Sequence, residues 1–352
     1  MSKPIELENL SEVVWIQTAF LGDIILTTAA GEALKKFAPN IRQCILTTPM
    51  GAQALKGQSV FEKVVSFDKK NASQLKAACD EAKRFVTSKD RAITIQPHKS
   101  LRSTYASWRI GLERITYEET AFSFWARHRV PRVTLLHESN RIKLLLEPLG
   151  ISRQDSFSLS PKLTPEVAES MASKSYKELP PGKSYLAVVP GSQWETKRWP
   201  DALFGKLVEK ILTETDHDVL LLGAPNETKH AEVIFSHVSK KHVSRLHDLV
   251  GKTKVAELAG VFKRCKAIVS NDSSPVHYGS SLDVPVVAIF GPTLPSMGFY
   301  PLSKRSVVVE QKDLPCRPCG LHGPRSCPLE HFNCMKSLEV EKVFRALRKV
   351  LE

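Results

Sequence analysis

Short, predominantly apolar segments alternate with segments of helical pattern along this chain, and the series occurs twice. Such apolar segments, separated by helices, are typical of strands that are covered on both faces of a parallel sheet. The first series predicts strands at 13–18, 44–48, 64–67 and 92–95 and helices at 24–37, 73–87 and 100–111. The second predicts strands at 184–191, 218–223, 267–272 and 284–292 and helices at 199–213, 226–238, 253–264 and 274–282. The fold class is therefore α/β, with two successive Rossmann-like, doubly wound parallel-sheet domains.

The length of 352 residues also favours two domains, because a single core usually serves roughly 100–200 residues. We expect a first domain over 1–175 and a second over 176–352, joined by a helical connector that ends at a Pro-Pro-Gly sequence at 180–182. The last helix, predicted over 338–351, is amphipathic and is a candidate for packing back on the first domain. Ligands are expected beyond the carboxyl ends of the strands, in the cleft between the domains.

Lysine and arginine number 50 against 37 acidic residues, and the net charge of +13 favours anionic partners. Nucleic acid, nucleotides, phosphorylated sugars and an acidic membrane face are all anionic. Residues 91–132 hold a local excess, which is either a solvated basic face or a binding surface. No apolar run approaches the roughly 18–20 residues of a membrane-spanning helix, and the acidic start of the chain is unlike a secretory signal. A cytoplasmic protein is expected.

Asp23 lies in the turn after the first strand, where a helix begins. A carboxylate in that place is favoured by helix capping and by the helix dipole. The preceding Leu21-Gly22 also permits a turn that directs the carboxylate toward a ligand, where it could deprotonate a hydroxyl group. Both roles are open from the sequence.

The turn PGSQWETKRWP at 190–200 follows a strand and precedes a helix, so it offers backbone N–H groups to an anion. Ser192, Thr196 and Lys197 add hydroxyl and cationic donors that suit a diphosphate. A simple basic turn is the alternative, since the spacing is not that of a P-loop. Glu227, at the next strand end, either favours a helix dipole or accepts hydrogen bonds from a ribose diol.

The segment SNDSSPVHYGSSL at 270–282 again stands where a strand ends and a helix begins. Asp272, Ser273 and Ser274 place a carboxylate and two hydroxyls at the helix start, and His277 follows one turn later. Together with the neighbouring FGPT sequence, this segment favours a second wall of an anion site. The alternative is that Asp272 caps the helix and His277 is an ordinary histidine.

Four cysteines gather late in the chain, at Cys316, Cys319, Cys327 and Cys334, with His331 among them. The CxxC and CxxxH spacings use the ligand types of a structural zinc site. The second half departs from the usual paired spacing, so a disulfide or free thiols are favoured over zinc. No catalytic metal is assigned.

The chain resembles glycosyltransferase family 9, the ADP-heptose:lipopolysaccharide heptosyltransferases. The matching segments are FLGDIILTTAAGEALKKFAP, PGSQWETKRWP, LLGAPNE, SNDSSPVHYGSSLDVPVVAIFGPT and CRPCG…CPLEHFNCM, in that order over nearly the whole chain. The resemblance implies the GT-B arrangement, with an acceptor-side first domain and a nucleotide-sugar-binding second domain. It implies an inverting transfer of heptose from ADP-heptose to the lipopolysaccharide inner core, and we favour the second heptose.

The resemblance also implies roles for particular residues. Asp23 matches the general base in the LGD turn of the family, and Lys197, with Thr196 beside it and Ser192 in the same turn, matches the lysine at the donor phosphates. Glu227 matches the acid at the donor ribose. No DxD motif stands at a matching strand end, so no metal or other cofactor is required by this interpretation.

Asp272, Ser273 and His277 match the segment that cradles the diphosphate and the sugar. Ser274 is a departure, because the family usually has glycine there, and glycine permits a closer approach of the backbone. Serine at this position leaves a different nucleotide sugar open as the donor.

The basic residues His98, Lys99, Arg102 and Arg109 fall on the acceptor side of the family. They suit a phosphorylated, Kdo-bearing lipid A acceptor at the cytoplasmic face of the inner membrane, to which the protein would bind peripherally. Two other classes were considered. A non-enzymatic nucleic-acid-binding protein would fit the charge but lacks a recognisable motif, and an NAD-dependent oxidoreductase would need GxGxxG where AFLGD stands.

Overall fold

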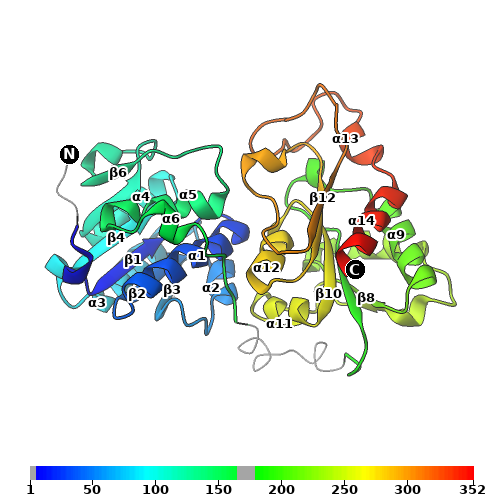
Figure 1. Cartoon of the computed structure of the whole chain (residues 1–352), viewed down its shortest axis with the longest axis horizontal. Coiled ribbons are helices and arrows are strands. Elements are labelled where there is room, and N and C mark those ends of the chain that lie inside the picture. The colour runs from blue at the N-terminus through cyan, green and yellow to red at the C-terminus, as the bar shows by residue number, and fades with distance from the viewer. Residues whose placement is uncertain (1–4, 165–178) are drawn as a thin grey trace. The chain divides into compact units, whose positions relative to one another are not determined.

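The computed structural model of the chain describes residues 5–164 and 179–352. It divides into two compact units, Met1–Leu163 and Thr164–Glu352, and each unit holds one six-stranded sheet (Figure 1). All the strand pairs are parallel, and helices connect the strands. The predicted α/β class with two doubly wound sheets is confirmed. The boundary expected at 175/176, and most of the predicted connector helix, fall outside the described residues.

The first sheet has the strand order β3-β2-β1-β4-β5-β6. Its strands are β1 (Glu12–Ile16), β2 (Arg42–Thr47), β3 (Lys63–Ser66), β4 (Ala92–Gln96), β5 (Glu113–Tyr117) and β6 (His128–Val130). The order runs outward in both directions from the neighbouring strands β1 and β4. The loops after these two strands therefore diverge at a topological switch point, where doubly wound sheets bind ligands.

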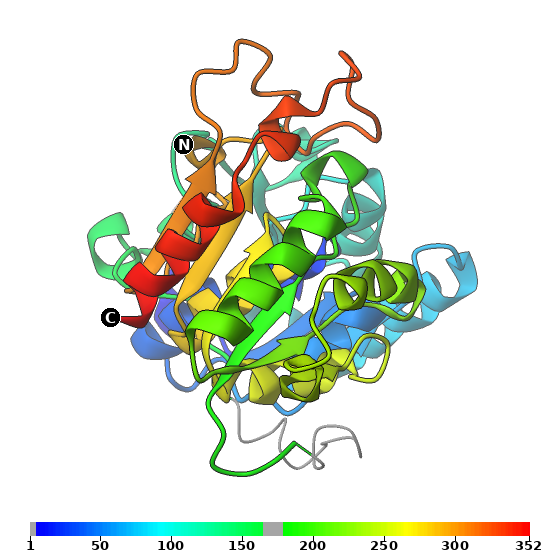
Figure 2. The ribbon, with the colours of Figure 1, turned by 90° about the vertical axis from the view of Figure 1, so that its right-hand side faces the viewer.

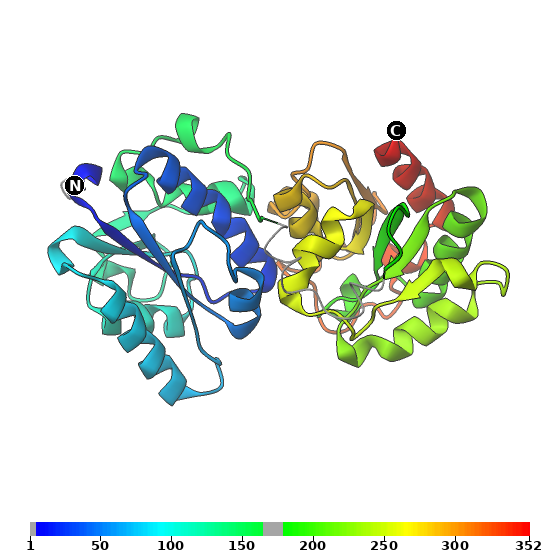
Figure 3. The same cartoon turned by 90° about the horizontal axis from the view of Figure 1, so that it is seen from below.

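Right-handed crossovers place the helices of the first unit on two faces of the sheet. The helix α1 (Leu21–Phe37) contacts α2 (Pro49–Ala54) and α5 (Glu138–Leu144). The helix α3 (Ala72–Phe85) contacts α4 (Leu101–Ile110) instead, and Figure 3 shows α1 and α3 on opposite sides of the strands. The buried side chains of α3 and α4 share one apolar cluster with those of β1, β2 and β3.

The second sheet has the strand order β12-β11-β10-β7-β8-β9, so its switch point lies between β10 and β7. Its strands are β7 (Tyr185–Val189), β8 (Asp218–Leu221), β9 (Leu246–Asp248), β10 (Cys265–Asn271), β11 (Val286–Phe290) and β12 (Ser306–Glu310). Its helices are α9 (Asp201–Glu214), α10 (Thr228–Ser236), α11 (Leu258–Lys263), α12 (Ser274–Leu282), α13 (Asn333–Lys336) and α14 (Val340–Leu351). Figure 2 shows α9 and α14 side by side in front of this sheet, in agreement with their mutual contacts.

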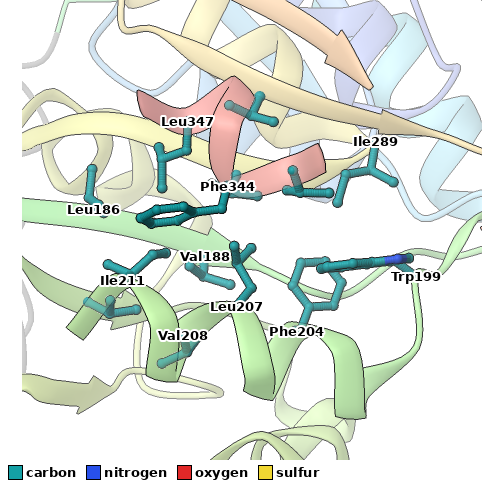
Figure 4. Close-up of a cluster of buried hydrophobic side chains, with 14 of the residues drawn as sticks. Leu186, Val188, Trp199, Phe204, Leu207, Val208, Ile211, Ile289, Phe344 and Leu347 are labelled. Atoms are coloured by element: carbon teal, nitrogen blue, oxygen red, sulfur yellow. The ribbon is translucent and has the colours of Figure 1, made fainter. Parts of the chain in front are cut away.

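The apolar face of α14 is buried within the second unit. Phe344 and Leu347 of this helix pack with Leu207 of α9 over Leu186 and Val188 of β7 (Figure 4). Each of these side chains is at most 2% exposed, so each contributes on the order of 1.5–3 kcal/mol of hydrophobic stabilisation. The last helix, which we considered as a candidate for packing on the first domain, uses its apolar face in the core of its own unit.

Two kinds of element differ from the sequence-based expectation. The helix predicted over 253–264 is regular only in α11 and is preceded by a 3-10 helix, Val255–Glu257, because the Glu257 carboxylate accepts a hydrogen bond from the Lys254 N–H and closes a tight first turn. The strands β5, β6, β9 and β12 were not predicted. Three of them, β6, β9 and β12, are edge strands, and in β6 and β9 polar residues interrupt the apolar pattern.

No helix within 5–164 or 179–352 has both the length and the apolar character needed to cross a bilayer.

Candidate functional site

Asp23 stands at the switch point of the first sheet, in the first turn of α1, directly after the loop that follows β1. The N-cap residue of α1 is Phe20, whose side chain does not cap the helix. Hydrogen bonding to the Phe20 backbone stabilises the ionised carboxylate of Asp23, as in the second half of a capping box. The capping role considered from the sequence is therefore present, and it also holds the carboxylate in one place.

The electrostatic surroundings of Asp23 suit a general base. Burial, and then the negative charge of Glu138, raise the pKa of the Asp23 carboxyl to about 7. Glu138 begins α5 and is itself buried, held by Arg141 at 2.8 Å and by Arg132 at 2.5 Å. A carboxylate with a pKa near the working pH can take a proton and release it again. Glu138 was not singled out from the sequence, because only the packing of α5 on α1 brings it near Asp23.

A second group at this switch point consists of cations around His98, which follows β4. Burial, together with the charges of Lys69, Arg102 and Lys99, lowers the pKa of His98 to about 4. The neutral ring shares hydrogen bonds with Thr18 Oγ1 at 2.8 Å and with hydroxyls at the start of α4. His98 therefore joins the ends of β1 and β4, and the three cations form a positive surface beside it.

Lys69 was missed by the sequence analysis. It lies after β3, is partly buried, and its pKa is lowered by burial and by Arg102 while the charge of Asp23 acts in the opposite direction. Arg109, by contrast, does not join the group around His98. Its guanidinium donates to both carboxylate oxygens of Asp80 on α3, at 2.9 and 3.2 Å, so it ties α4 to α3.

In the second unit, Lys197, Asp272 and Thr293 meet at the switch point between β7 and β10. The Lys197 Nζ atom lies 2.6 Å from Asp272 Oδ2, and the Thr293 hydroxyl donates to the same oxygen at 2.6 Å. All three residues are at most 9% exposed. Asp272 thus binds the lysine rather than capping α12, the alternative considered from the sequence. A buried ammonium at a strand end is suited to bind a phosphate group.

Asn271 connects the two turns that carry these residues, and it was not predicted. Its side-chain amide donates to the Pro190 carbonyl at 2.6 Å and accepts from the Trp199 N–H at 3.0 Å. The turn after β7 is therefore bonded at both of its ends to the last residue of β10. The only sequence signal was its place immediately before Asp272.

The start of α12 supplies the other residues of the predicted cradle. Ser273 is the N-cap residue, but its hydroxyl does not accept a capping hydrogen bond from the first turn of α12. Ser274 and Pro275 follow in the first turn. Burial and the charge of Lys197 lower the pKa of His277 to about 3, and its buried Nδ1 atom has no hydrogen-bond partner within the described residues. The imidazole is therefore neutral and adjacent to the lysine.

Glu227 lies over two glycines at the ends of β7 and β8. Its Oε2 atom accepts a hydrogen bond from the Ala224 N–H at 2.7 Å. A Cβ atom at Gly191 would be 2.2 Å from Oε1, and one at Gly223 would be 2.8 Å from Oε2. The carboxylate therefore rests directly on the turn that also contains Ser192, whose hydroxyl accepts from the Trp194 N–H.

The segment that carries the late cysteines contacts the turn with Lys197. The Thr196 hydroxyl donates to the Pro324 carbonyl, and Trp194 stacks on His322 with a centroid separation of 6.5 Å. A Cβ atom at Gly323 would lie 2.9 Å from Pro292, which shows how closely the segment approaches the neighbouring turn.

The four cysteines of this segment are free thiols, and burial raises the pKa of Cys334 to about 11, with smaller effects from Cys316, Cys319 and Cys327. Within the part of the chain that the structure describes, no three His, Cys, Asp or Glu side chains are arranged to hold a metal ion.

The chain matches the model of glycosyltransferase family 9 (heptosyltransferase) over residues 90–327, which is more than half of its length. The chain belongs to this family. The matched region includes His98 of the first unit and the whole set from Ser192 to Thr293 of the second. The resemblance stated from the sequence is confirmed.

Curated relatives of this glycosyltransferase family 9 protein include a lipooligosaccharide heptosyltransferase 2 from Campylobacter jejuni, 30% identical over 172 residues, which are 49% of this chain and 52% of that protein. A lipopolysaccharide heptosyltransferase 2 from Escherichia coli is 28% identical over 165 residues, 46% of this chain and 47% of that protein. A lipopolysaccharide heptosyltransferase 1 from Pseudomonas aeruginosa is 34% identical over 139 residues, 40% of this chain and 37% of that protein. The chain therefore spans about half the length of the curated relatives it matches, or less.

Solved structures match nearly the whole chain. A family 9 glycosyltransferase from Veillonella parvula has a TM-score of 0.80 and 22% identity, with 99% of both chains covered. The E. coli ADP-heptose lps heptosyltransferase II has a TM-score of 0.77 and 17% identity, covering 97% of this chain and 98% of that one. At these identities the likeness shows the fold, which is the GT-B fold expected from the sequence.

Proposed function

We propose that this chain is an inverting glycosyltransferase that moves heptose from ADP-heptose to the lipopolysaccharide inner core. The observation that carries the proposal is Asp23, a carboxylate with a pKa of about 7 at the switch point of the first sheet. In the proposed reaction it removes the proton of an acceptor hydroxyl as that oxygen attacks the anomeric carbon, from the face opposite the leaving ADP. The new glycosidic bond forms as the bond to the diphosphate breaks.

The donor is proposed to bind the second unit. Lys197 would neutralise charge that develops on the departing diphosphate, aided by the free N–H groups at the start of α12 around Ser273 and Ser274. Asp272 and His277 would contact the sugar and the phosphates, and Glu227 the ribose hydroxyls. Ser192 and Thr196 would complete the turn. This assignment gives the charge compensation to protein side chains and includes no metal or other cofactor.

The acceptor is proposed to be a Kdo-bearing lipid A, bound by Lys99 and Arg102 beside His98. Lys69 belongs to this set because its charge acts on both Asp23 and Arg102. Arg109 is removed from it because Asp80 already binds its guanidinium. The protein would then work at the cytoplasmic face of the inner membrane, as a peripheral protein.

The second heptose of the core is our preferred position, since several relatives are named heptosyltransferase 2. Relatives named heptosyltransferase 1 and 3 also match, so the acceptor must be tested. Ser274, in place of the usual glycine, is the reason to include other nucleotide sugars as donors.

The experiment measures ADP release from ADP-heptose with two acceptors, Kdo-lipid A without heptose and the same acceptor carrying one heptose. We expect release only with the singly heptosylated acceptor, and a fall of roughly 10²–10⁴ in kcat for Asp23→Asn with ADP binding retained. Asp283→Asn is the matched control, because Asp283 is exposed and has the left-handed backbone conformation that asparagine also tolerates.

Three results decide the proposal. Full turnover by Asp23→Asn would refute the base assignment. Release with the acceptor that lacks heptose would assign the first heptose rather than the second. No release with either acceptor, followed by turnover of another nucleotide sugar, would refute ADP-heptose as the donor.

A further inference from the structure

Large apolar side chains are exposed along one side of α4. Leu101, Tyr105 and Trp108 are spaced by four and three residues, so they share one face of the helix. Trp108 is 68% exposed and Leu101 65%, and the Tyr105 and Trp108 rings are 6.0 Å apart. The opposite face of α4 is buried in the first unit, at Ala106 and Ile110. Leu101, Tyr105 and Trp108 are not part of that buried cluster.

A second set of exposed aromatic side chains lies between β5 and β6. Phe124 and Trp125 are 64% and 67% exposed, and their rings meet edge-on at 5.0 Å. Phe122 stacks on Trp125 with a centroid separation of 5.1 Å. Three aromatic rings thus pack on one another at the surface instead of in the core, in a left-handed turn at Phe122 followed by a 3-10 helix.

Both sets lie on the same side of the first sheet. The Thr104 hydroxyl of α4 donates to the Ala121 carbonyl at 3.1 Å, so the aromatic turn begins directly beside the helix. Arg114 of β5 donates to the Phe122 carbonyl at 2.6 Å from beneath the turn. We call Leu101, Tyr105, Trp108, Phe122, Phe124 and Trp125 the aromatic surface.

Uncompensated positive charge accompanies the aromatic surface. Parallel pairing places Gln96, Thr116 and Arg129 in one row across β4, β5 and β6, and the Gln96 side chain bonds Thr104 of α4. Arg129 therefore points to the side of the sheet that α4 covers. It is exposed and has no ion pair within the described residues, and Lys99 and Arg102 at the start of α4 are exposed as well.

The surrounding acids do not balance this charge. Residues 99–132 contain seven lysines and arginines and three glutamates. Arg109, Arg127 and Arg132 are paired with Asp80, Glu113 and Glu138, whereas Lys99, Arg102 and Arg129 have no ion pair within the described residues. The region is therefore both aromatic and positively charged.

We propose that the aromatic surface inserts into the headgroup region of a bilayer that contains anionic lipids, with Arg129, Lys99 and Arg102 at the phosphates. Tryptophan, tyrosine and phenylalanine favour the boundary between hydrocarbon and headgroups, and arginine and lysine beside them add electrostatic attraction. Stable attachment usually needs two such signals, and this surface supplies both.

The inference rests on the proposed function in one respect, because it names the membrane at which a lipid-borne acceptor would be reached. It assigns the contact to the aromatic surface and Arg129, which no step of the proposed reaction uses, whereas Lys99 and Arg102 are shared with the proposed acceptor site. Binding to plain lipid can therefore be measured without donor, acceptor or turnover.

The test is cosedimentation of the full chain with vesicles of phosphatidylethanolamine and phosphatidylglycerol, compared with vesicles of phosphatidylcholine alone. We expect binding to the anionic vesicles that weakens with salt. The double variant Trp108→Ser/Trp125→Ser should bind the anionic vesicles at least roughly tenfold more weakly. Arg129→Gln should lower binding only to the anionic vesicles. Leu329→Ser, at an apolar residue of the second unit that is 59% exposed, is the control and should bind like the unsubstituted chain.

A second arm separates this inference from the proposed function. With an acceptor dispersed in detergent, the double variant should turn over at the normal rate, and with the same acceptor in vesicles it should be slow. Turnover without any vesicle binding would overturn the membrane contact and leave the function intact. Vesicle binding without turnover on any acceptor would refute the proposed function and leave the membrane contact intact.

Self-association provides the last check, by light scattering without lipid. If the chain is a dimer that dissociates in the double tryptophan variant, and the variant binds vesicles like the unsubstituted chain, the aromatic surface contacts a second copy of the chain. That result would overturn the proposal.

Discussion

A methyl group at Gly191 would collide with the carboxylate of Glu227, and this collision makes the role of Glu227 measurable. In Gly191→Ala the new Cβ atom would be 2.2 Å from Oε1 and 2.4 Å from Oε2. Carbon and oxygen atoms do not approach so closely, and Glu227 ends in a flexible side chain, so the carboxylate must move. It would then lose the hydrogen bond from the Ala224 N–H at 2.7 Å.

The size of the effect follows from the bonds that Glu227 makes. Loss of a hydrogen bond at the start of a helix costs about 0.5–2 kcal/mol of stability. A hydrogen bond from a ribose hydroxyl to a carboxylate is worth roughly 1.5–3 kcal/mol, which corresponds to about a 10- to 150-fold rise in the Kd for ADP. The turnover number should change little, because the ribose is remote from the bond that breaks.

The assay is calorimetric titration of ADP into four proteins, namely the unsubstituted chain, Gly191→Ala, Glu227→Ala and the double variant. Gly191→Ala should weaken ADP binding strongly in the presence of Glu227 and hardly at all in its absence, since the collision has then been removed. Gly223→Ala, where the approach is 2.8 Å, should have a smaller effect in the same direction. Equal effects of Gly191→Ala in both backgrounds, or unchanged ADP affinity, would refute the placement of Glu227 at the donor.

Two further predictions concern the charges of the site. For Glu138→Gln, the loss of negative charge should lower the pKa of Asp23 from about 7. The acid limb of kcat/KM against pH should then move to lower pH, because the base must be ionised to act. Glu147→Gln is the control, and an acid limb that stays in place in Glu138→Gln would show that Glu138 does not act on Asp23. For Lys197→Ala, the donor KM should rise and kcat should fall about 10²-fold, since a buried cation at the phosphates is lost. The control is Lys304→Ala, because Lys304 is an exposed lysine. An unchanged donor KM and rate in Lys197→Ala would count against the phosphate role.

Much of the fold could be predicted because its elements are local. The apolar strands β1, β7 and β11 are buried on both faces, so each is a largely continuous apolar run in the sequence. Of the four edge strands, only β3 was predicted, and β6 and β9 were missed because polar side chains interrupt their apolar residues. In β6, for example, Arg129 is exposed between two buried neighbours.

The local parts of the candidate site were also accessible from the sequence. Asp23, Lys197 and Asp272 each stand where a predicted strand ends and a helix or tight turn begins, and such places offer free N–H groups whatever the rest of the chain does. The sequence could not separate capping from ligand binding for Asp23 and Asp272. The structure distinguishes the two residues, since Asp272 binds Lys197 and Thr293, whereas Asp23 is bonded to the start of its own helix.

The sequence by itself therefore determined the kind of fold, the strand ends and the residue types at them, because these depend on short-range patterns of burial and turn formation. Only the tertiary structure decided the strand order, which sets the two switch points, and which distant residues meet there. A parallel sheet gathers the ends of strands that are far apart in the chain, and so it brings Lys69 and Glu138 toward Asp23 and joins Asn271 to Pro190. It also placed Arg109 against Asp80 of α3 instead of beside Arg102, because the two arginines are about two turns apart along the axis of α4.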